Sequence, residues 1–264
     1  MTPFRFHRPA DLVEAVAARG EGGCYLAGGQ SLLGALKLGL ASPDTLVDLA
    51  RLPELQGIAC QGDTLSVGAA VTHAGLAEGG CTLPALAALA GSIGDLQVRN
   101  MGTLGGALAN ADPASDHAAG ILGLGAIIRT DRRVLAADDF FLGMFETALE
   151  PGEIIVAVDY PLPVTAIYLK IRNPASGYPV VGVLVARTRS GVRVAVTGAA
   201  PTPFRLPDFE AALAGDFTAA ALTGLTVAED DLNRDLHATA AYRAHLIGVL
   251  AARAMTALNC GCKP

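Results

Sequence analysis

The first 60 residues alternate short apolar runs with helical patterns. Apolar positions three and four residues apart predict a helix over 11–19, which Gly20 ends. Short apolar runs predict buried strands over 24–27 and 45–49, with a helical segment over 31–38 between them. A strand, a helical segment and a second strand in this order are typical of a βαβ-type unit.

From residue 58 onward, hairpins and short helices replace this pattern. Two apolar runs flank Gln61-Gly62-Asp63, which predicts a hairpin over 58–69. Pro84 stands at the first position of a predicted helix, where its missing N–H costs no hydrogen bond. The remaining segments are helices over 71–77, 84–90 and 116–125, a glycine-rich loop over 100–111, and strands over 127–129, 134–135 and 153–160.

The segment Pro161-Leu162-Pro163 predicts a domain boundary, because two prolines interrupt both helices and strand ladders. After it the chain has strands first and helices later, which favours an α+β arrangement. The predicted strands are 166–172, 180–187 and 192–197, and the predicted helices are 207–214, 217–222 and 240–258.

Composition raises the question of a membrane segment, because 52% of the 264 residues are hydrophobic and the mean hydropathy is +0.43. The uncharged stretches, such as 22–36 and 79–94, are shorter than about 18 residues and are broken by Gly or Pro. We therefore expect no membrane span, and tight packing with burial against partner chains. A net charge of −6 without a basic run argues against nucleic-acid binding.

The cysteines and histidines show no metal-binding spacing, so we expect no metal site. No pair among Cys24, Cys60, Cys81, Cys260 and Cys262 has the CxxC spacing, and the Cys260-Gly-Cys262 tail is interpreted as a frayed terminus. Reduced thiols fit the cytoplasm, and the first residues lack the apolar core of a secretion signal. No side chain is identified as a catalytic acid or base.

The first glycine segment, Ala27-Gly28-Gly29-Gln30-Ser31-Leu32, follows a predicted strand and precedes a helical turn. Glycine lets the backbone approach a ligand closely and adopt positive φ, and the helix start supplies N–H groups for a phosphate. On this segment alone a simple turn with Ser31 as the N-cap is the favoured interpretation. The segment matches neither the Rossmann nor the P-loop motif.

A second segment, 97–116, combines three glycines with small residues and two aspartates, Asp112 and Asp116. Small residues keep a chain close to a large flat or polyphosphate ligand, and the aspartates can accept hydrogen bonds from ribose or ribityl hydroxyls. Helix capping is the alternative role of each aspartate. Two separated glycine segments together suggest an extended dinucleotide, clamped by backbone amides from two subdomains.

These motifs resemble those of the FAD-binding medium subunit of molybdenum hydroxylases, the carbon monoxide dehydrogenase and xanthine dehydrogenase family. AGGQSLL with KLGLASPDTLVDL is similar to the family's first flavin loop, and QVRNMGTLGGALANADPASD to its second. DDFFLGMFETALEPGEIIVAVDYPLP resembles the end of the flavin domain, and YLKIR resembles part of the C-terminal domain. The resemblance covers nearly the whole chain in the right order.

The resemblance implies an α+β fold and the cofactor FAD. A PCMH-type FAD-binding domain would occupy residues 1–162, as subdomains over about 1–57 and 58–162, and a C-terminal α+β domain of the CO dehydrogenase flavoprotein type would occupy 163–264. Residues 27–31 would wrap the pyrophosphate, 103–107 would make a second phosphate-side contact, and Asp116 would bind the adenosine side. The implied FAD-binding residues are Ala27, Gly28, Gly29, Gln30, Ser31, Leu32, Thr103, Leu104, Gly105, Gly106, Ala107, Asn110, Asp116, Ile155 and Lys170.

The resemblance also implies electron relay within a complex. A molybdopterin-binding large subunit would oxidise the substrate, and a [2Fe–2S] small subunit would pass electrons to FAD on this chain and then to an external acceptor. The implied assembly is a dimer of heterotrimers. Two alternatives stay open: a stand-alone FAD oxidoreductase, and a non-catalytic scaffold subunit. The scaffold is suggested by Ala107 and Gly177, which differ from the family's pattern, as does Asn110.

Overall fold

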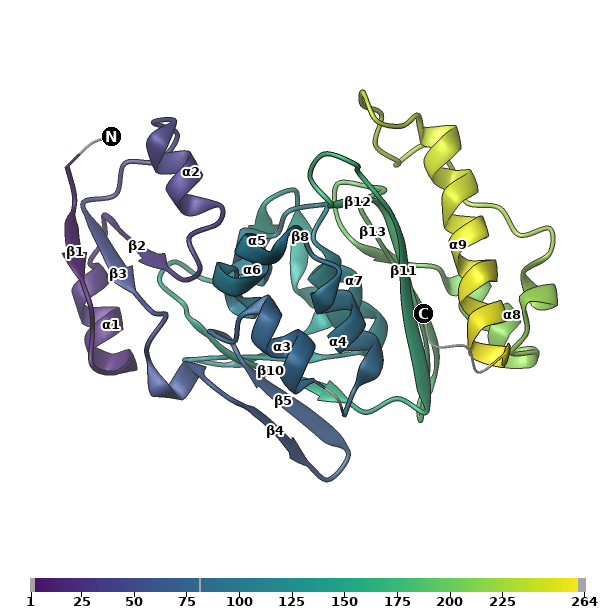
Figure 1. Cartoon of the computed structure of the whole chain (residues 1–264), viewed down its shortest axis with the longest axis horizontal. Coiled ribbons are helices and arrows are strands. Elements are labelled where there is room, and N and C mark those ends of the chain that lie inside the picture. The colour runs from purple at the N-terminus through teal and green to yellow at the C-terminus, as the bar shows by residue number, and fades with distance from the viewer. Residues whose placement is uncertain (1–2, 81, 261–264) are drawn as a thin grey trace.

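A computed structural model describes residues 3–80 and 82–260, so Cys81 and Cys262 lie outside the described residues. Three units follow one another along the long axis of the molecule (Figure 1): an N-terminal parallel sheet, a central sheet with its helices, and a C-terminal sheet backed by a long helix. Helices and sheets are mixed throughout, as the predicted α+β class requires.

The N-terminal unit is the predicted βαβ arrangement with one additional strand. Its parallel sheet has the order β1-β3-β2, and the strand β1 was not predicted. Asp11 caps the first helix by accepting a hydrogen bond from the Glu14 N–H at 2.8 Å. The elements are β1 (Arg5–His7), α1 (Leu12–Arg19), β2 (Gly23–Leu26), α2 (Leu32–Lys37), β3 (Thr45–Asp48) and the 3₁₀ turn η1 (Pro53–Leu55).

The central unit is a five-stranded antiparallel sheet in the order β4-β5-β10-β6-β7, with its helices packed on one face (Figure 1). The predicted hairpin forms β4 and β5. The middle strand, β10, comes much later in the chain and ends at the predicted boundary. The elements are β4 (Ile58–Gln61), β5 (Thr64–Gly68), α3 (His73–Gly79), α4 (Pro84–Gly91), α5 (Leu96–Met101), α6 (Leu104–Asn110), α7 (Asp116–Leu124), β6 (Ile127–Thr130), β7 (Val134–Ala136), η2 (Ala137–Asp139), β8 (Phe141–Gly143), β9 (Glu146–Thr147) and β10 (Ile155–Pro161).

The glycine-rich segment over 100–111 is mostly helical, so the prediction of a loop there was wrong. Its helices α5 and α6 meet at Gly102 and Thr103. Thr103 starts α6 as a side-chain N-cap, accepting from the Gly106 N–H at 3.2 Å. Gly105 packs against Ala69, where an added Cβ would lie 2.6 Å from the Ala69 Cβ. The glycines of this segment therefore allow close packing of a helix as well as a turn.

The C-terminal unit is a four-stranded antiparallel sheet in the order β11-β12-β13-β14. One face packs on α4 and α7 of the central unit, and the other packs on α8 and α9 (Figure 1). The predicted helix over 217–222 is a 3₁₀ turn instead, because only residues 219–222 are helical. The elements are β11 (Thr165–Arg172), β12 (Pro179–Thr188), β13 (Gly191–Thr197), β14 (Phe204–Arg205), α8 (Pro207–Gly215), η3 (Ala219–Leu222) and α9 (Ala240–Cys260).

The central and C-terminal units share buried side chains. Tyr168 and Leu184 of the C-terminal sheet belong to the same hydrophobic cluster as Leu86 and Leu124 of the central helices. The domain boundaries at 57 and 162 stay predictions. Among the residues that the structure describes, no helix combines the length and the apolar character needed to cross a bilayer.

Candidate functional site

A cavity of about 480 Å³ lies where the N-terminal and central units meet. Its walls come from the segment after β2, the start of α6, the start of α7, the turn before β10, and Tyr178 beside β12. The two glycine segments therefore face one cavity although some 70 residues separate them. The site is assembled from both halves of the predicted FAD-binding domain.

The first glycine segment lies between β2 and α2 and fits the cavity wall only as glycine. An added Cβ on Gly28 would lie 2.0 Å from the Met101 carbonyl oxygen, so the two segments touch backbone to backbone. Gly29 has φ +73°, in the left-handed region that glycine favours. Ser31 occupies the N-cap position of α2, but its side chain makes no capping bond to the described residues. The simple-turn interpretation therefore lacks its expected contact.

The two segments differ in their backbone donors. No acceptor among residues 3–80 and 82–260 is bonded to the N–H groups of Gly29, Gln30 or Ser31. In the second segment the N–H groups of Leu104, Gly105 and Ala107 donate to the carbonyl oxygens of Val71, Ala69 and Thr103, respectively. The first segment thus has three successive backbone donors without an acceptor in the described chain, whereas most N–H groups at the start of α6 are already bonded.

Asp116, the first residue of α7, is 2% exposed and lies in the cavity wall. Its Oδ1 accepts hydrogen bonds from the Tyr168 hydroxyl and from the Lys170 ammonium, both at 2.7 Å. Its Oδ2 has no hydrogen-bond partner within the described part of the chain. Burial raises the pKa of Asp116 above its ordinary value, while Lys170 and Tyr168 act in the opposite direction.

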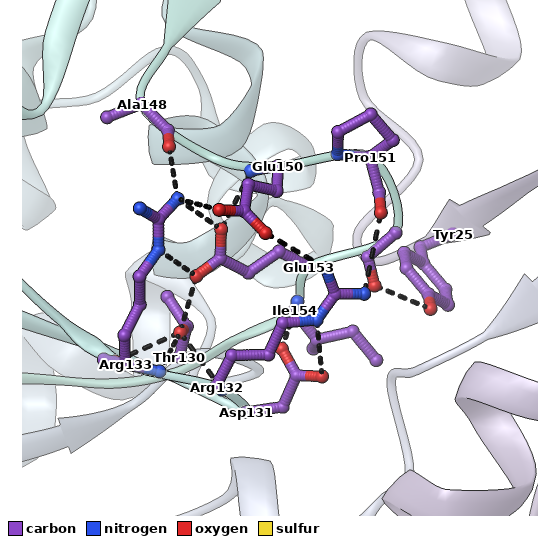
Figure 2. Close-up of polar contacts among 11 residues, drawn as sticks. Tyr25, Thr130, Asp131, Arg132, Arg133, Ala148, Glu150, Pro151, Glu153 and Ile154 are labelled. Carbon is purple, nitrogen blue, oxygen red and sulfur yellow. Dashed lines mark hydrogen bonds and ion pairs between the residues drawn. The ribbon is translucent and has the colours of Figure 1, made fainter.

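Another part of the wall contains a buried glutamate, Glu153, next to the Pro151-Gly152 turn (Figure 2). Glu153 accepts hydrogen bonds from the Arg133 guanidinium and from the Thr130 hydroxyl, at distances of 2.7–2.9 Å. The turn faces the N-terminal unit, where the Tyr25 hydroxyl donates to the Gly152 carbonyl oxygen at 3.1 Å. This hydrogen bond joins the N-terminal unit to the central unit at the cavity wall.

Two buried histidines form another polar part of the wall. The ring nitrogens His117 Nε2 and His73 Nδ1 are 3.1 Å apart, so one of them donates to the other. The His73 ring fills the space that Gly102 leaves, since an added Cβ there would lie 2.6 Å from His73 Nε2. Burial lowers the pKa of His73 to about 4, with Arg99 acting in the same direction. Both rings are neutral at pH 7.

The structure brings together all but two of the residues expected to bind the cofactor. Leu104 is fully buried in the core, and Lys170 lies behind Asp116. The cavity wall contains Ala27, Gly28, Gly29, Gln30, Ser31, Leu32, Thr103, Gly105, Gly106, Ala107, Asn110, Asp116 and Ile155. Sequence reasoning missed Tyr25, His73, His117, Gly152, Glu153 and Tyr178. Of these, only Gly152, beside a proline, carried a turn signal in the sequence.

Comparison with known protein families gives two matches that together span most of the chain. Residues 2–163 match the FAD binding domain in molybdopterin dehydrogenase. Residues 176–258 match the CO dehydrogenase flavoprotein C-terminal domain. The order of the two matches agrees with the order that the resemblance implied.

Individual relatives agree with this assignment. The carbon monoxide dehydrogenase medium chain of Hydrogenophaga pseudoflava is 35% identical over an alignment that covers 98% of both chains. The nicotine 6-hydroxylase medium subunit of Paenarthrobacter nicotinovorans is 32% identical, covering 95% of both. Among solved structures, carbon monoxide dehydrogenase from H. pseudoflava superimposes with a TM-score of 0.87 at 35% identity over the whole of both chains. Quinoline 2-oxidoreductase from Pseudomonas putida 86 gives 0.88 at 28% identity over 99% of both.

Proposed function

This chain belongs to the FAD-binding medium subunits of the molybdenum hydroxylases, and from that membership we propose that the cavity between its two glycine segments holds FAD and that the chain relays electrons within a larger complex. The family makes the chain an oxidoreductase subunit with FAD as its cofactor. The observation that carries the placement is that the N–H groups of Gly29, Gln30 and Ser31, three residues of the cavity wall, have no acceptor in the described part of the chain.

The cavity fits FAD in three respects. Free backbone donors beside a left-handed glycine suit the pyrophosphate. The unpaired and buried Oδ2 of Asp116 requires a donor, which a ribose or ribityl hydroxyl supplies. Apolar wall residues such as Leu32, Leu55 and Ile155 suit a planar ring system.

The residues of this chain act by binding and orienting. The first glycine segment donates to the phosphates, and the second brings its backbone close to the first. Asp116 accepts from a hydroxyl, and the Tyr25–Gly152 contact closes one end of the cavity. Bound FAD supplies the redox chemistry, and the protein tunes and shields it.

Electron relay would need partner subunits for the other steps. Among its described residues no group of three or more His, Cys, Asp or Glu side chains is placed to hold a metal ion. We assign the substrate oxidation to a molybdopterin-binding large subunit and the delivery of electrons to a [2Fe–2S] small subunit, in a dimer of heterotrimers. Cys24 and Cys60, which are free cysteines, suit a reducing cytoplasm.

Exposed apolar side chains near the cavity support association with such partners. Leu38 and Leu40, which follow the first glycine segment, are 76% and 78% exposed. Met144 and Phe145, at the tip of the β8–β9 hairpin, are also exposed, and the Phe145 N–H donates to the Ala111 carbonyl oxygen at the end of α6. A cofactor cavity flanked by exposed apolar side chains is an arrangement that a partner subunit would cover.

The test is co-expression with the molybdenum and iron–sulfur subunits, followed by rapid mixing with substrate. We expect a stoichiometric yellow complex that releases FAD, not FMN, on denaturation, and whose flavin absorbance is bleached by substrate. The isolated chain should bind FAD without being reduced by substrate. Reduction of the isolated chain would instead support a stand-alone oxidoreductase. An active complex without flavin would support a scaffold.

A further inference from the structure

Lys170 lies on β11 of the C-terminal sheet, yet its ammonium group is buried behind the cofactor cavity. Its side chain is 6% exposed, and that of its ion-pair partner Asp116 is 1% exposed. Lys170 does not contribute to the cavity wall, whereas Asp116 does. The lysine is therefore separated from the proposed cofactor by the carboxylate that it contacts.

All three N–H bonds of the Lys170 ammonium already have acceptors. The Nζ atom lies 2.7 Å from Asp116 Oδ1, 3.0 Å from the Ser92 carbonyl oxygen and 2.9 Å from the Gly177 carbonyl oxygen. A protonated lysine has three donors and no acceptor. It has no hydrogen left to donate to a ligand in the cavity.

The same contacts fix the orientation of the Asp116 carboxylate. Lys170 and Tyr168 both donate to Oδ1, and both come from β11. The other oxygen, Oδ2, is buried in the cavity wall without a partner in the described chain. Two donors on one oxygen fix the carboxylate and leave its second oxygen without a donor in the described chain.

We propose that Lys170 is a positioning residue, which holds the Asp116 carboxylate so that its Oδ2 accepts a hydroxyl of the cofactor, and that it does not touch the cofactor itself. Tyr168 acts on the same oxygen in the same way. The C-terminal unit thereby takes part in cofactor binding through a side chain of the central unit. This inference rests on the proposed placement of FAD.

A double-mutant cycle on the full chain tests the inference, with FAD affinity measured by fluorescence quenching. Asp116→Ala should weaken FAD binding by about tenfold, as loss of one charged hydrogen bond predicts. Lys170→Met should weaken it by a similar factor in the wild-type background. In the Asp116→Ala background Lys170→Met should change the affinity by less than about twofold, because a residue that acts through another loses its effect with it.

The alternatives give different results. A further loss of about tenfold in the Asp116→Ala background would mean that Lys170 contacts FAD directly, which overturns the inference. Unchanged affinity in Asp116→Ala would instead remove Asp116 from the site and contradict the proposed placement of FAD. Arg172→Gln is the matched control, because Arg172 lies on the same strand and shares the Ser92 carbonyl oxygen but does not contact Asp116. It should retain wild-type affinity.

Two further measurements decide the question if Lys170→Met folds poorly. Tyr168→Phe removes a donor to the same oxygen, and it too should weaken FAD binding only when Asp116 is present.

The pH dependence of FAD binding gives the second readout. Asp116 is faced by Tyr168, Lys170 and Tyr178, and Lys170 in turn by Arg99 and Arg172. Lys170 opposes the rise that burial causes in the pKa of Asp116, so without Lys170 this pKa should rise further and FAD affinity should weaken more on acidification than it does in the wild type. A flat profile in Lys170→Met would contradict the assigned role.

Discussion

The guanidinium of Arg133 holds the carboxylate of Glu153 in two parallel hydrogen bonds, Nε to Oε1 at 2.9 Å and Nη2 to Oε2 at 2.8 Å (Figure 2). The Glu150 N–H also donates to Oε2, at 2.7 Å, so the pair fixes the turn between Glu150 and Glu153. Gly152 in this turn receives the hydrogen bond from Tyr25. A planar two-point contact of this kind constrains geometry as well as charge. The shape of one end of the cavity therefore depends on a pair of side chains behind it.

Replacing Glu153 should lower the free energy of unfolding at pH 7 and should also reduce the pH dependence of this free energy in acid. Arg133 lowers the pKa of Glu153 from 4.5 to about 2 against the opposing effect of burial. A carboxyl with a lowered pKa contributes stability above its unfolded pKa and loses it as the pH falls to its folded pKa. Glu153→Gln should therefore cost about 2–4 kcal/mol at pH 7 and flatten the stability profile between about pH 4.5 and pH 2. Denaturant unfolding over this pH range measures both.

Glu21→Gln, at an exposed turn, is the matched control and should leave stability and its pH dependence unchanged. A Glu153→Gln protein as stable as the wild type at pH 7 would show that the Arg133 contact contributes nothing to the fold.

Gly28→Ala should separate the two glycine segments. The added methyl group would lie 2.0 Å from the Met101 carbonyl oxygen, which belongs to backbone and cannot rotate away. We expect a loss of about 1–3 kcal/mol in unfolding free energy, typical of overpacking, and an FAD content well below that of the wild type. Thermal unfolding and flavin extraction measure the two effects.

Gly34→Ala is the matched change on the adjacent helix α2. An added Cβ there meets nothing within 4 Å, so alanine should stabilise the helix by about 0.5–1 kcal/mol and leave the flavin content unchanged. Normal flavin content in a folded Gly28→Ala protein would show that close contact between the segments is not needed for binding.

The sequence predicts the order of most strands and helices because their signals are local. Asp11 caps α1 through the N–H of Glu14, three residues later, and Gly29 stands three residues after the end of β2. Most of the site is not local. Tyr25 and Gly152 are 127 residues apart, and His73 and His117 are 44 apart, so no window of sequence contains both members of either contact.

Local signals also gave a wrong prediction where a glycine-rich composition is compatible with both a loop and a closely packed helix. The stretch 100–111 has the glycines of a loop, but Thr103 caps a helix there and tertiary packing on Ala69 uses the missing side chain of Gly105. The backbone of Ala111 has φ 46° and that of Phe145 has φ 57°, in a region that neither residue favours. The hydrogen bond from the Phe145 N–H to the Ala111 carbonyl oxygen, at 3.1 Å, connects these two positions. Such conformations follow from tertiary context.

Tyr25→Phe should loosen the cavity while keeping the ring in place. The substitution removes the hydroxyl that donates to the Gly152 carbonyl oxygen, and the ring keeps its contact with the Arg19 guanidinium, 5.6 Å from the ring centroid. Loss of one neutral hydrogen bond predicts a cost of about 1 kcal/mol and FAD dissociation faster by about fivefold. Stopped-flow displacement of FAD measures the rate. Tyr242→Phe on α9, half exposed, is the control and should dissociate FAD at the wild-type rate.

The buried histidine pair should make the chain lose stability in mild acid, above the range in which Glu153 titrates. Burial lowers the pKa of His117 well below its ordinary value, and that of His73 to about 4, so the folded chain holds both rings neutral. The unfolded chain protonates them near about pH 6.5. Stability should therefore fall as the pH decreases from about 6.5 toward about 4, by at most about 1.4 kcal/mol per pH unit for each ring.

His117→Gln removes one titrating ring and keeps a hydrogen-bonding side chain beside His73, so the pH profile of its unfolding free energy should be distinctly flatter in this interval. His245→Gln, exposed on α9, should follow the wild type. Urea unfolding at half-unit pH steps measures the slopes, and an unchanged slope in His117→Gln would show that this ring is not held neutral by the fold.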